Sequence, residues 1–181
     1  MITNSYRKIL ACLLSGHGAA YTHVPITDAL GATVYIGGTS TIGNNTGLTA
    51  PTTTPILTNT ATSYGIKFGS GTTAATASDY ELESLITSGA SITRTDADTF
   101  LDNDGNPYVV LRYTVTNTSS SADLTIAEVG SFQQFAVATT EGGTTAKRAV
   151  MVDRTLLDTP LVITPQNAAV VTYTLKSILP V

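Results

Sequence analysis

The clearest pattern of apolar and polar residues begins at Val109. Up to Thr116, apolar or aromatic residues fall on one side of an extended chain and polar ones on the other: Val109, Leu111, Tyr113 and Val115 against Arg112, Thr114 and Thr116. Side chains of a β-strand point alternately to opposite faces, so this pattern predicts a strand with one buried face. A polar turn-forming cluster at Asn117–Ser121 and a second apolar run at Leu124–Val129 then complete a predicted hairpin.

Similar strand patterns continue along most of the chain. In the last of them Val171 and Tyr173 alternate with Thr172 and Thr174. Asp104-Gly105 favours a hairpin turn, because both central residues of a type I′ turn need positive φ. The other expected strands are Tyr21–Ile26 and Ala32–Ile36, as a hairpin around Asp28–Gly31, then Ser63–Phe68, Ile92–Asp96, Thr99–Leu101, Val129–Ala138, Arg148–Leu157, Pro160–Ile163 and Ala168–Leu175. About eight short strands at this spacing predict an all-β fold, a β-sandwich or jelly roll.

A helical period appears near the N-terminus. It predicts a helix over Ser5–Leu14, with Asn4 or Ser5 as N-cap, Gly16 as the stop and an apolar stripe of Tyr6, Ile9, Leu10, Leu13 and Leu14. So short a helix is marginal alone. Its stripe must therefore dock, either on the sheet of its own subunit, which we favour, or on a neighbouring chain. The capping-box spacing of Ser78–Glu81 predicts one or two further helical turns.

These patterns divide the chain into an N-terminal helical segment, residues 1–18, and a single β-sandwich domain, residues 19–181. Within that domain, residues 37–60 are rich in Thr, Gly, Asn and Pro and carry no regular pattern. Structureless segments of this length are uncommon inside a compact domain. We expect an extended loop or arm at 37–60 rather than a linker, because the N-terminal part is too short to hold its own core.

Composition narrows the possible functions mainly through charge. Hydrophobic residues make up 42% of the 181 residues and charged residues only 12%, against roughly 25% charged in typical domains. The chain therefore folds, with a surface that depends on uncharged Thr, Ser and Asn. Its net charge of −4 argues against nucleic-acid binding and a membrane-surface role, which need clustered Lys and Arg. No segment approaches the roughly 18 apolar residues of a membrane span.

Cysteine chemistry is limited to Cys12. One cysteine cannot form an internal disulfide, so the fold depends on burial alone. Ile9–Cys12 faintly resembles a lipobox after a basic pair. However, the stretch between Lys8 and Cys12 is far shorter than the apolar core of about 7–15 residues that a signal peptide needs. We expect Cys12 to be a small buried hydrophobe.

No residue arrangement indicates a catalytic, cofactor or metal site. The two histidines, His17 and His23, lack further ligands at zinc-binding spacing, and no G-x-S-x-G nucleophile elbow occurs. Gly69–Thr73 lacks the lysine of a phosphate loop, and Glu81 and Glu83 are no better than a chance carboxylate pair. Four acidic residues lack the spacing of a Ca²⁺-binding loop: Asp96, Asp98, Asp102 and Asp104. We expect them to lie exposed to solvent at the tip of a hairpin.

Three segments together resemble β-sandwich virion proteins of tailed bacteriophages. The first is a Gly-Thr-rich turn, Phe68–Thr73, that leads to Asp-Tyr-x-Leu-Glu at Asp79–Glu83. The second is Val109–Phe132, where a strand ending in Thr-Asn-Thr precedes Leu-Thr-Ile-Ala-Glu-Val-Gly-Ser-Phe. The third is Val152–Pro160, followed by a Pro165-centred turn and Val171–Leu175. The likeness covers about residues 63–178. It implies a location in the virion and no catalytic residues.

We therefore expect a non-enzymatic structural component of a tailed-phage virion, assembled in the host cytoplasm. It would be a homo-oligomeric building block of the neck, collar or tail, with copies of itself and other virion proteins as partners. A capsid decoration or head-fibre protein is the nearest alternative. A glycan-binding adhesin module is disfavoured, because only 7% of residues are aromatic and none is Trp. A hydrolase on a jelly-roll scaffold is disfavoured by the missing site.

Overall fold

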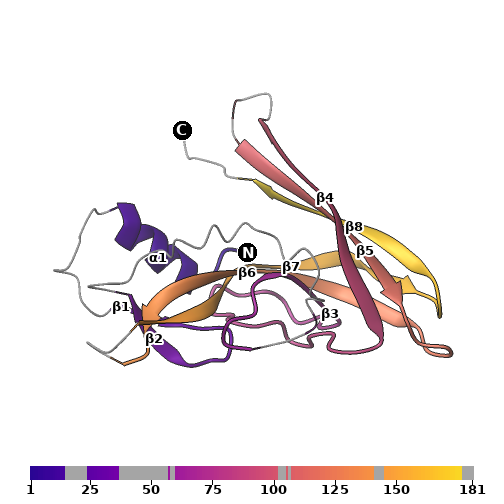
Figure 1. The fold of residues 1–181 in the computed structure, drawn as a ribbon, viewed down its shortest axis with the longest axis horizontal. Helices are drawn as coiled ribbons and strands as arrows, with labels where there is room; N and C mark the ends of the chain where they lie inside the picture. Colours follow the sequence, from indigo (N-terminus) through magenta and orange to yellow (C-terminus); the bar gives the residue numbers. More distant parts are fainter. Residues whose placement is uncertain are drawn as a thin grey trace. The chain divides into compact units, whose positions relative to one another are not determined.

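The computed structural model of the chain describes residues 1–14, 24–36, 57, 60–101, 105, 107–140 and 145–176. In these ranges it contains one helix, α1 (Asn4–Leu14), and a series of strands (Figure 1). The strands are β1 (Val24–Thr27), β2 (Thr33–Ile36), β3 (Gly65–Gly69), β4 (Ala90–Leu101), β5 (Pro107–Asn117), β6 (Leu124–Ala138), β7 (Thr145–Ile163) and β8 (Ala168–Lys176). The expected all-β fold with a short N-terminal helix is confirmed.

The strands form two sheets. In the larger sheet β1, β2, β6 and β3 lie in that order, and β7 pairs with β6. The smaller sheet has the order β4-β5-β8. The pairs β1–β2, β2–β6, β3–β6, β4–β5 and β5–β8 are all antiparallel. This agrees with the alternation of apolar and polar residues in the sequence.

The contacts of the chain define two compact units. The first unit comprises Met1–Pro51, Ile56–Thr87 and Thr125–Leu161, and the second comprises Thr52–Pro55, Ser88–Leu124 and Val162–Val181. The first unit therefore holds α1 with nearly all of the larger sheet, and the second holds the smaller sheet. This grouping differs from the expected helical segment of 1–18 and single domain of 19–181. The expected arm at 37–60 lies almost entirely outside the described residues.

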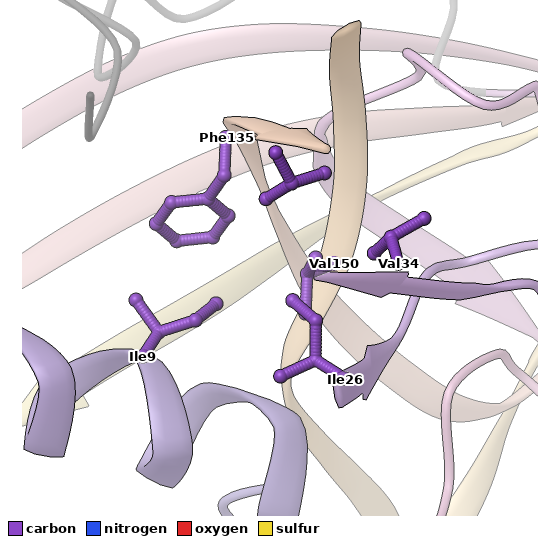
Figure 2. Packing of buried hydrophobic residues seen from close by; sticks show 6 residues of the cluster. Ile9, Ile26, Val34, Phe135 and Val150 are labelled. Carbon is purple, nitrogen blue, oxygen red and sulfur yellow. The ribbon is translucent and has the colours of Figure 1, made fainter. Parts of the chain in front are cut away.

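In the first unit, α1 packs on the larger sheet. Ile9 is only 2% exposed and joins a cluster of buried side chains from the strands: Ile26, Val34, Phe135, Val137 and Val150 (Figure 2). Tyr6 packs against this cluster, with its ring centroid 6.5 Å from that of Phe135. The favoured expectation that the helix docks on its own sheet is confirmed.

The start of α1 corrects the expected cap. Neither Asn4 nor Ser5 is the N-cap, because the helix begins at Asn4 and Thr3 precedes it. Thr3 is completely buried, and its Oγ1 accepts a hydrogen bond from the Tyr6 amide at 3.3 Å. The same hydroxyl donates to the Met151 carbonyl on β7 at 2.6 Å. The residue that caps the helix therefore also joins it to the sheet.

The predicted hairpin between β5 and β6 is wrong, because the two strands belong to different sheets. Asn117, at the end of β5, is 1% exposed and explains the break. Its Nδ2 donates to the carbonyls of Ala122 at 2.9 Å and Ile163 at 2.8 Å, and its Oδ1 accepts from the Ser119 amide at 2.9 Å. The polar cluster that resembled a hairpin turn is thus organised around a buried amide.

Two pairs of predicted short strands are in fact continuous. Ile92–Asp96 and Thr99–Leu101 are parts of β4, whose register against β5 shifts between Arg94 and Asp96. Such a bulge accommodates one extra residue without ending the strand, so it explains the interrupted pattern. Arg148–Leu157 and Pro160–Ile163 are likewise parts of β7. The expected hairpins β1–β2 and β4–β5 are confirmed.

The helix expected after Ser78–Glu81 is absent: this described segment consists of turns, bends and irregular residues, with an isolated β-bridge at Leu85. The Asp79 carboxylate accepts hydrogen bonds from the Thr76 amide at 3.0 Å and the Thr76 hydroxyl at 2.6 Å. These polar residues therefore close a turn rather than cap a helix.

The smaller sheet keeps the predicted alternation only in part, because at the start of β5 Val110 is buried whereas Val109 and Leu111 are half-buried. On β5, Tyr113 is 2% exposed and Val115 is fully buried. On β8, Val171 and Tyr173 are buried, whereas Thr172 and Thr174 are exposed. Burial raises the pKa of Tyr113 to about 12.

Candidate functional site

Three long charged side chains are buried in the first unit. Lys67 and Glu128 have no exposed surface, and the side chain of Arg154 is 4% exposed. Burying a charge is unfavourable unless it is paired and hydrogen-bonded. Three carboxylates supply this pairing for Arg154, and we call the four residues together the arginine cluster: Asp79 and Glu83 from the segment between β3 and β4, Glu128 from β6 and Arg154 from β7.

Arg154 contacts its partners through three different nitrogens. Nε donates to Glu128 Oε2 at 2.7 Å and Nη1 donates to Asp79 Oδ2 at 2.7 Å. Nη2 donates to the Thr73 carbonyl at 3.1 Å and lies 3.5 Å from Glu83 Oε2. The planar fork of a guanidinium suits several acceptors at once, which a lysine ammonium would not reproduce. Arg154 therefore ties the segment after β3 to the strands of the sheet.

The carboxylate of Glu128 binds backbone amides of the same segment. Oε1 accepts from the amides of Gly71 at 3.1 Å and Ser84 at 2.8 Å, and Oε2 accepts from the Glu83 amide at 3.2 Å. A Cβ on Gly71 would lie 2.6 Å from Oε1, so a larger residue there would displace the carboxylate. The Gly-rich turn at Gly69–Thr73 thus surrounds a buried carboxylate.

Hydrogen bonds and ion pairs shift the pKa values of three members of the arginine cluster. Burial alone would raise the pKa of Asp79, but hydrogen bonds from Thr76 and Arg154 bring it below its ordinary value. Hydrogen bonds from the Thr73 side chain and amide lower the pKa of Glu83. Burial acts to lower the pKa of Arg154, yet its carboxylate partners raise it. All three shifts favour the charged forms of Asp79, Glu83 and Arg154.

The arginine cluster borders a depression with a volume of about 390 Å³ in the first unit. It is lined by Thr73, Ala74, Thr76, Ser78, Asp79, Tyr80, Glu81, Glu83 and Arg154. The Thr73 hydroxyl donates to Glu83 and the Thr76 hydroxyl donates to Asp79, each at 2.6 Å. A general base works best with a pKa near the working pH. The lowered pKa values of Asp79 and Glu83 make these carboxylates hydrogen-bond acceptors rather than efficient bases.

Among the described residues, Lys67 is the other buried cation. Its Nζ lies 4.2 Å from the centroid of the Phe132 ring, within the range of a cation–π interaction. Gly130 pairs with Lys67 across β3 and β6 and leaves room for that ring, because a Cβ there would lie 2.9 Å from Phe132 Cε2. Burial lowers the pKa of Lys67 to about 8, although the charge of Glu81 partly opposes the shift.

Lys67→Met tests this buried charge by its pH dependence. The pKa of Lys67 is about 8 in the folded chain, below its ordinary 10.5. The resulting destabilisation is fully present below pH 8 and disappears as the pH rises toward 10.5. We expect the unmodified protein to gain roughly 1–2 kcal/mol relative to Lys67→Met between about pH 7 and about pH 9.5. Urea denaturation of both proteins at both pH values measures this gain, and a constant difference would contradict it.

The acidic residues expected at a solvated hairpin tip are differently placed. Asp96 and Asp98 lie on β4, and both pair with Arg112 on β5. Arg112 Nη1 contacts Asp96 Oδ2 and lies 3.3 Å from Asp98 Oδ2. The tip interpretation is therefore wrong for these two residues, whose carboxylates form a cross-strand ion pair. Asp102 and Asp104 lie outside the described residues.

The remaining sequence candidates do not converge on a site. His17 and His23 lie outside the described residues, and Cys12 is half-buried rather than buried. Glu83 belongs to the arginine cluster, whereas the charge of Glu81 acts on Lys67. Within the described ranges, no group of three or more His, Cys, Asp or Glu side chains is placed to hold a metal ion.

Sequence analysis did not select Glu128 or Arg154, although a signal for them exists. Both interrupt strand segments that are otherwise largely apolar, in a chain with few charges. Charged residues inside such strands are expected to be paired. Their partners could not be read from the chain, because Arg154 is 26 residues from Glu128 and 75 from Asp79 in sequence.

The fold and the arginine cluster define an all-β protein in which the buried Arg154 and Glu128 bind each other. None of the family models, curated proteins or solved structures compared with this chain matches it. In the part of the chain that the structure describes, no helix has both the length and the apolar character needed to cross a membrane.

Proposed function

We propose that this chain is a non-enzymatic structural protein that assembles with copies of itself. The observation that carries the proposal is that the buried charges of the chain hold its own backbone in place. Arg154 and Glu128 bind each other and the backbone of the segment between β3 and β4. Their chemistry holds that segment in place, and the neighbouring carboxylates are poorly suited to act as bases. Such a fixed surface suits repeated packing against neighbours.

The resemblance of residues 63–178 to tailed-phage virion proteins supports a more specific proposal. On that basis the chain is a component of the neck, collar or tail of a phage particle, formed in the host cytoplasm. Its partners are further copies of itself and other virion proteins. The low charge and Thr-rich composition are consistent with close packing in such an assembly. Capsid decoration or a head fibre is the alternative placement.

Quantitative mass spectrometry of purified particles tests the proposal. Particles from a host that produces this chain should contain it at a fixed ratio to the major capsid protein. Separated heads and tails then discriminate the placements: enrichment with tails or necks supports the proposal, and enrichment with heads supports decoration. Purified particles that lack the chain would overturn the virion assignment. Binding of the purified chain on a glycan array, or turnover of a polysaccharide, would favour an adhesin or a hydrolase instead.

A further inference from the structure

The smaller sheet ends in two edge strands of different character. Among the described strands, β4 and β8 each pair only with β5. In an antiparallel strand, alternate residues turn their N–H and C=O groups away from the paired neighbour. An outer edge of this kind is a template for pairing with another chain, and natural proteins usually protect it with charges, prolines or bulges.

Of these two edges, β4 carries more of this protection. Its register shifts between Arg94 and Asp96, and it carries the charges of Arg94, Asp96 and Asp98. β8, in contrast, pairs with β5 without a register shift, and its one charged residue is Lys176 at the C-terminal end of the strand; Ala168–Leu175 contains no charge and no proline. Val170 on β8 is 63% exposed. As far as the described residues show, the edge of β8 therefore carries little of this protection and is partly apolar.

We propose that the outer edge of β8 pairs with the same edge of a second copy of this chain, antiparallel about a two-fold axis at Thr172. The inference rests on the proposed self-assembly and names the contact that it uses. In this register Thr172 faces the partner's Thr172, Val171 faces the partner's Tyr173, and Val170 faces the partner's Thr174. The smaller sheets of the two copies then form one continuous sheet.

The two faces of the strand agree with this register. Val171 and Tyr173 are 8% and 9% exposed, so a buried residue meets a buried residue across the axis. Val170, Thr172 and Thr174 are exposed and meet one another on the opposite face. Aromatic–aliphatic and threonine pairs are favourable cross-strand neighbours. The uncharged stretch also brings no like charges together. Pairing with the partner's β4 would instead meet its bulge and charged residues.

A charge exchange at Thr172 tests the contact in the full chain. Like charges directly opposite each other destabilise a strand pair. We expect Thr172→Lys and Thr172→Glu each to lower the molar mass measured by light scattering during size-exclusion chromatography at least twofold. An equimolar mixture of the two variants should restore the mass of the unmodified assembly. Thr93→Lys and Thr93→Glu are the controls, because Thr93 is an exposed threonine on the other edge strand, and neither should change the mass. Thr172 lies opposite Arg112 on β5 whereas Thr93 lies opposite Thr114, so the restored mass of the mixed Thr172 variants is the result that identifies the contact.

Cross-linking gives a second measurement that does not depend on a new charge. In a Cys12→Ser background, Thr172→Cys should form a disulfide-linked dimer on mild oxidation, whereas Thr93→Cys should remain unlinked. An unmodified chain that stays monomeric at every concentration would overturn the proposed self-assembly and this contact with it. An oligomeric chain whose mass is unchanged in the Thr172 variants, with no Thr172→Cys cross-link, would overturn the β8 contact alone.

Discussion

Arg154→Met is expected to lower the free energy of unfolding by about 3–5 kcal/mol at neutral pH, the usual effect of removing one partner of a buried ion pair. The variant leaves Glu128, which has no exposed surface, without its 2.7 Å contact to Nε. It also removes the donor to Asp79 and the bond that holds the Thr73 carbonyl. Urea denaturation followed by circular dichroism measures the loss. Arg154→Lys should recover only part of it, because an ammonium cannot reproduce the three-way fork.

Arg112→Met is the control for this prediction, since it removes an arginine that also binds two carboxylates. The Arg112 side chain is 38% exposed, and its partners Asp96 and Asp98 are 47% and 44% exposed. Solvent-exposed ion pairs contribute only about 0–1 kcal/mol. We expect a loss within that range. Equal losses of unfolding free energy for Arg154→Met and Arg112→Met would show that burial does not determine how much the arginine cluster contributes to stability.

Ile9→Ala is expected to lower the free energy of unfolding by about 2–5 kcal/mol, as other large-to-small core substitutions do. Ile9 is 2% exposed and packs between α1 and the strands of the first unit, where Val150 and Phe135 belong to the same cluster (Figure 2). Because these contacts lie within one chain, the loss should be independent of protein concentration. Denaturation at two widely separated concentrations measures both quantities.

Ile2→Ala makes the same chemical change at a side chain that is 44% exposed. We expect a change within about 0.5 kcal/mol, as for most surface substitutions. If Ile9→Ala were as mild as Ile2→Ala, or if its effect appeared only at high concentration, the helix would be docking on a neighbouring chain rather than on its own sheet.

Local periodicity was sufficient to predict much of the fold. The alternation around Tyr113 and Val115 places the buried face of β5 correctly, and the same holds for Val171 and Tyr173 on β8. The helical stripe through Ile9 likewise predicted a docked helix. These features depend on residues close together in sequence, whose side chains must separate apolar from polar surface within one element.

Features that depend on distant partners were missed. The cap of α1 is Thr3, whose hydroxyl also binds a carbonyl of β7 148 residues away. The turn after Asn117 resembled a hairpin, but a buried amide directs the chain out of the smaller sheet. The candidate site was missed for the same reason, because Glu128 and Arg154 are recognisable only by the partners that the fold brings to them.

By itself, the sequence determined the class of fold, the positions of most strands and the low charge of the surface, since these follow from local periodicity and composition. Only the tertiary structure decided which strands share a sheet and which charges neutralise one another inside the first unit. The physical reason is that a buried guanidinium or carboxylate is tolerable only in a complete shell of partners. Here the shell around Arg154 comes from two distant parts of the chain, the segment between β3 and β4 and strand β6.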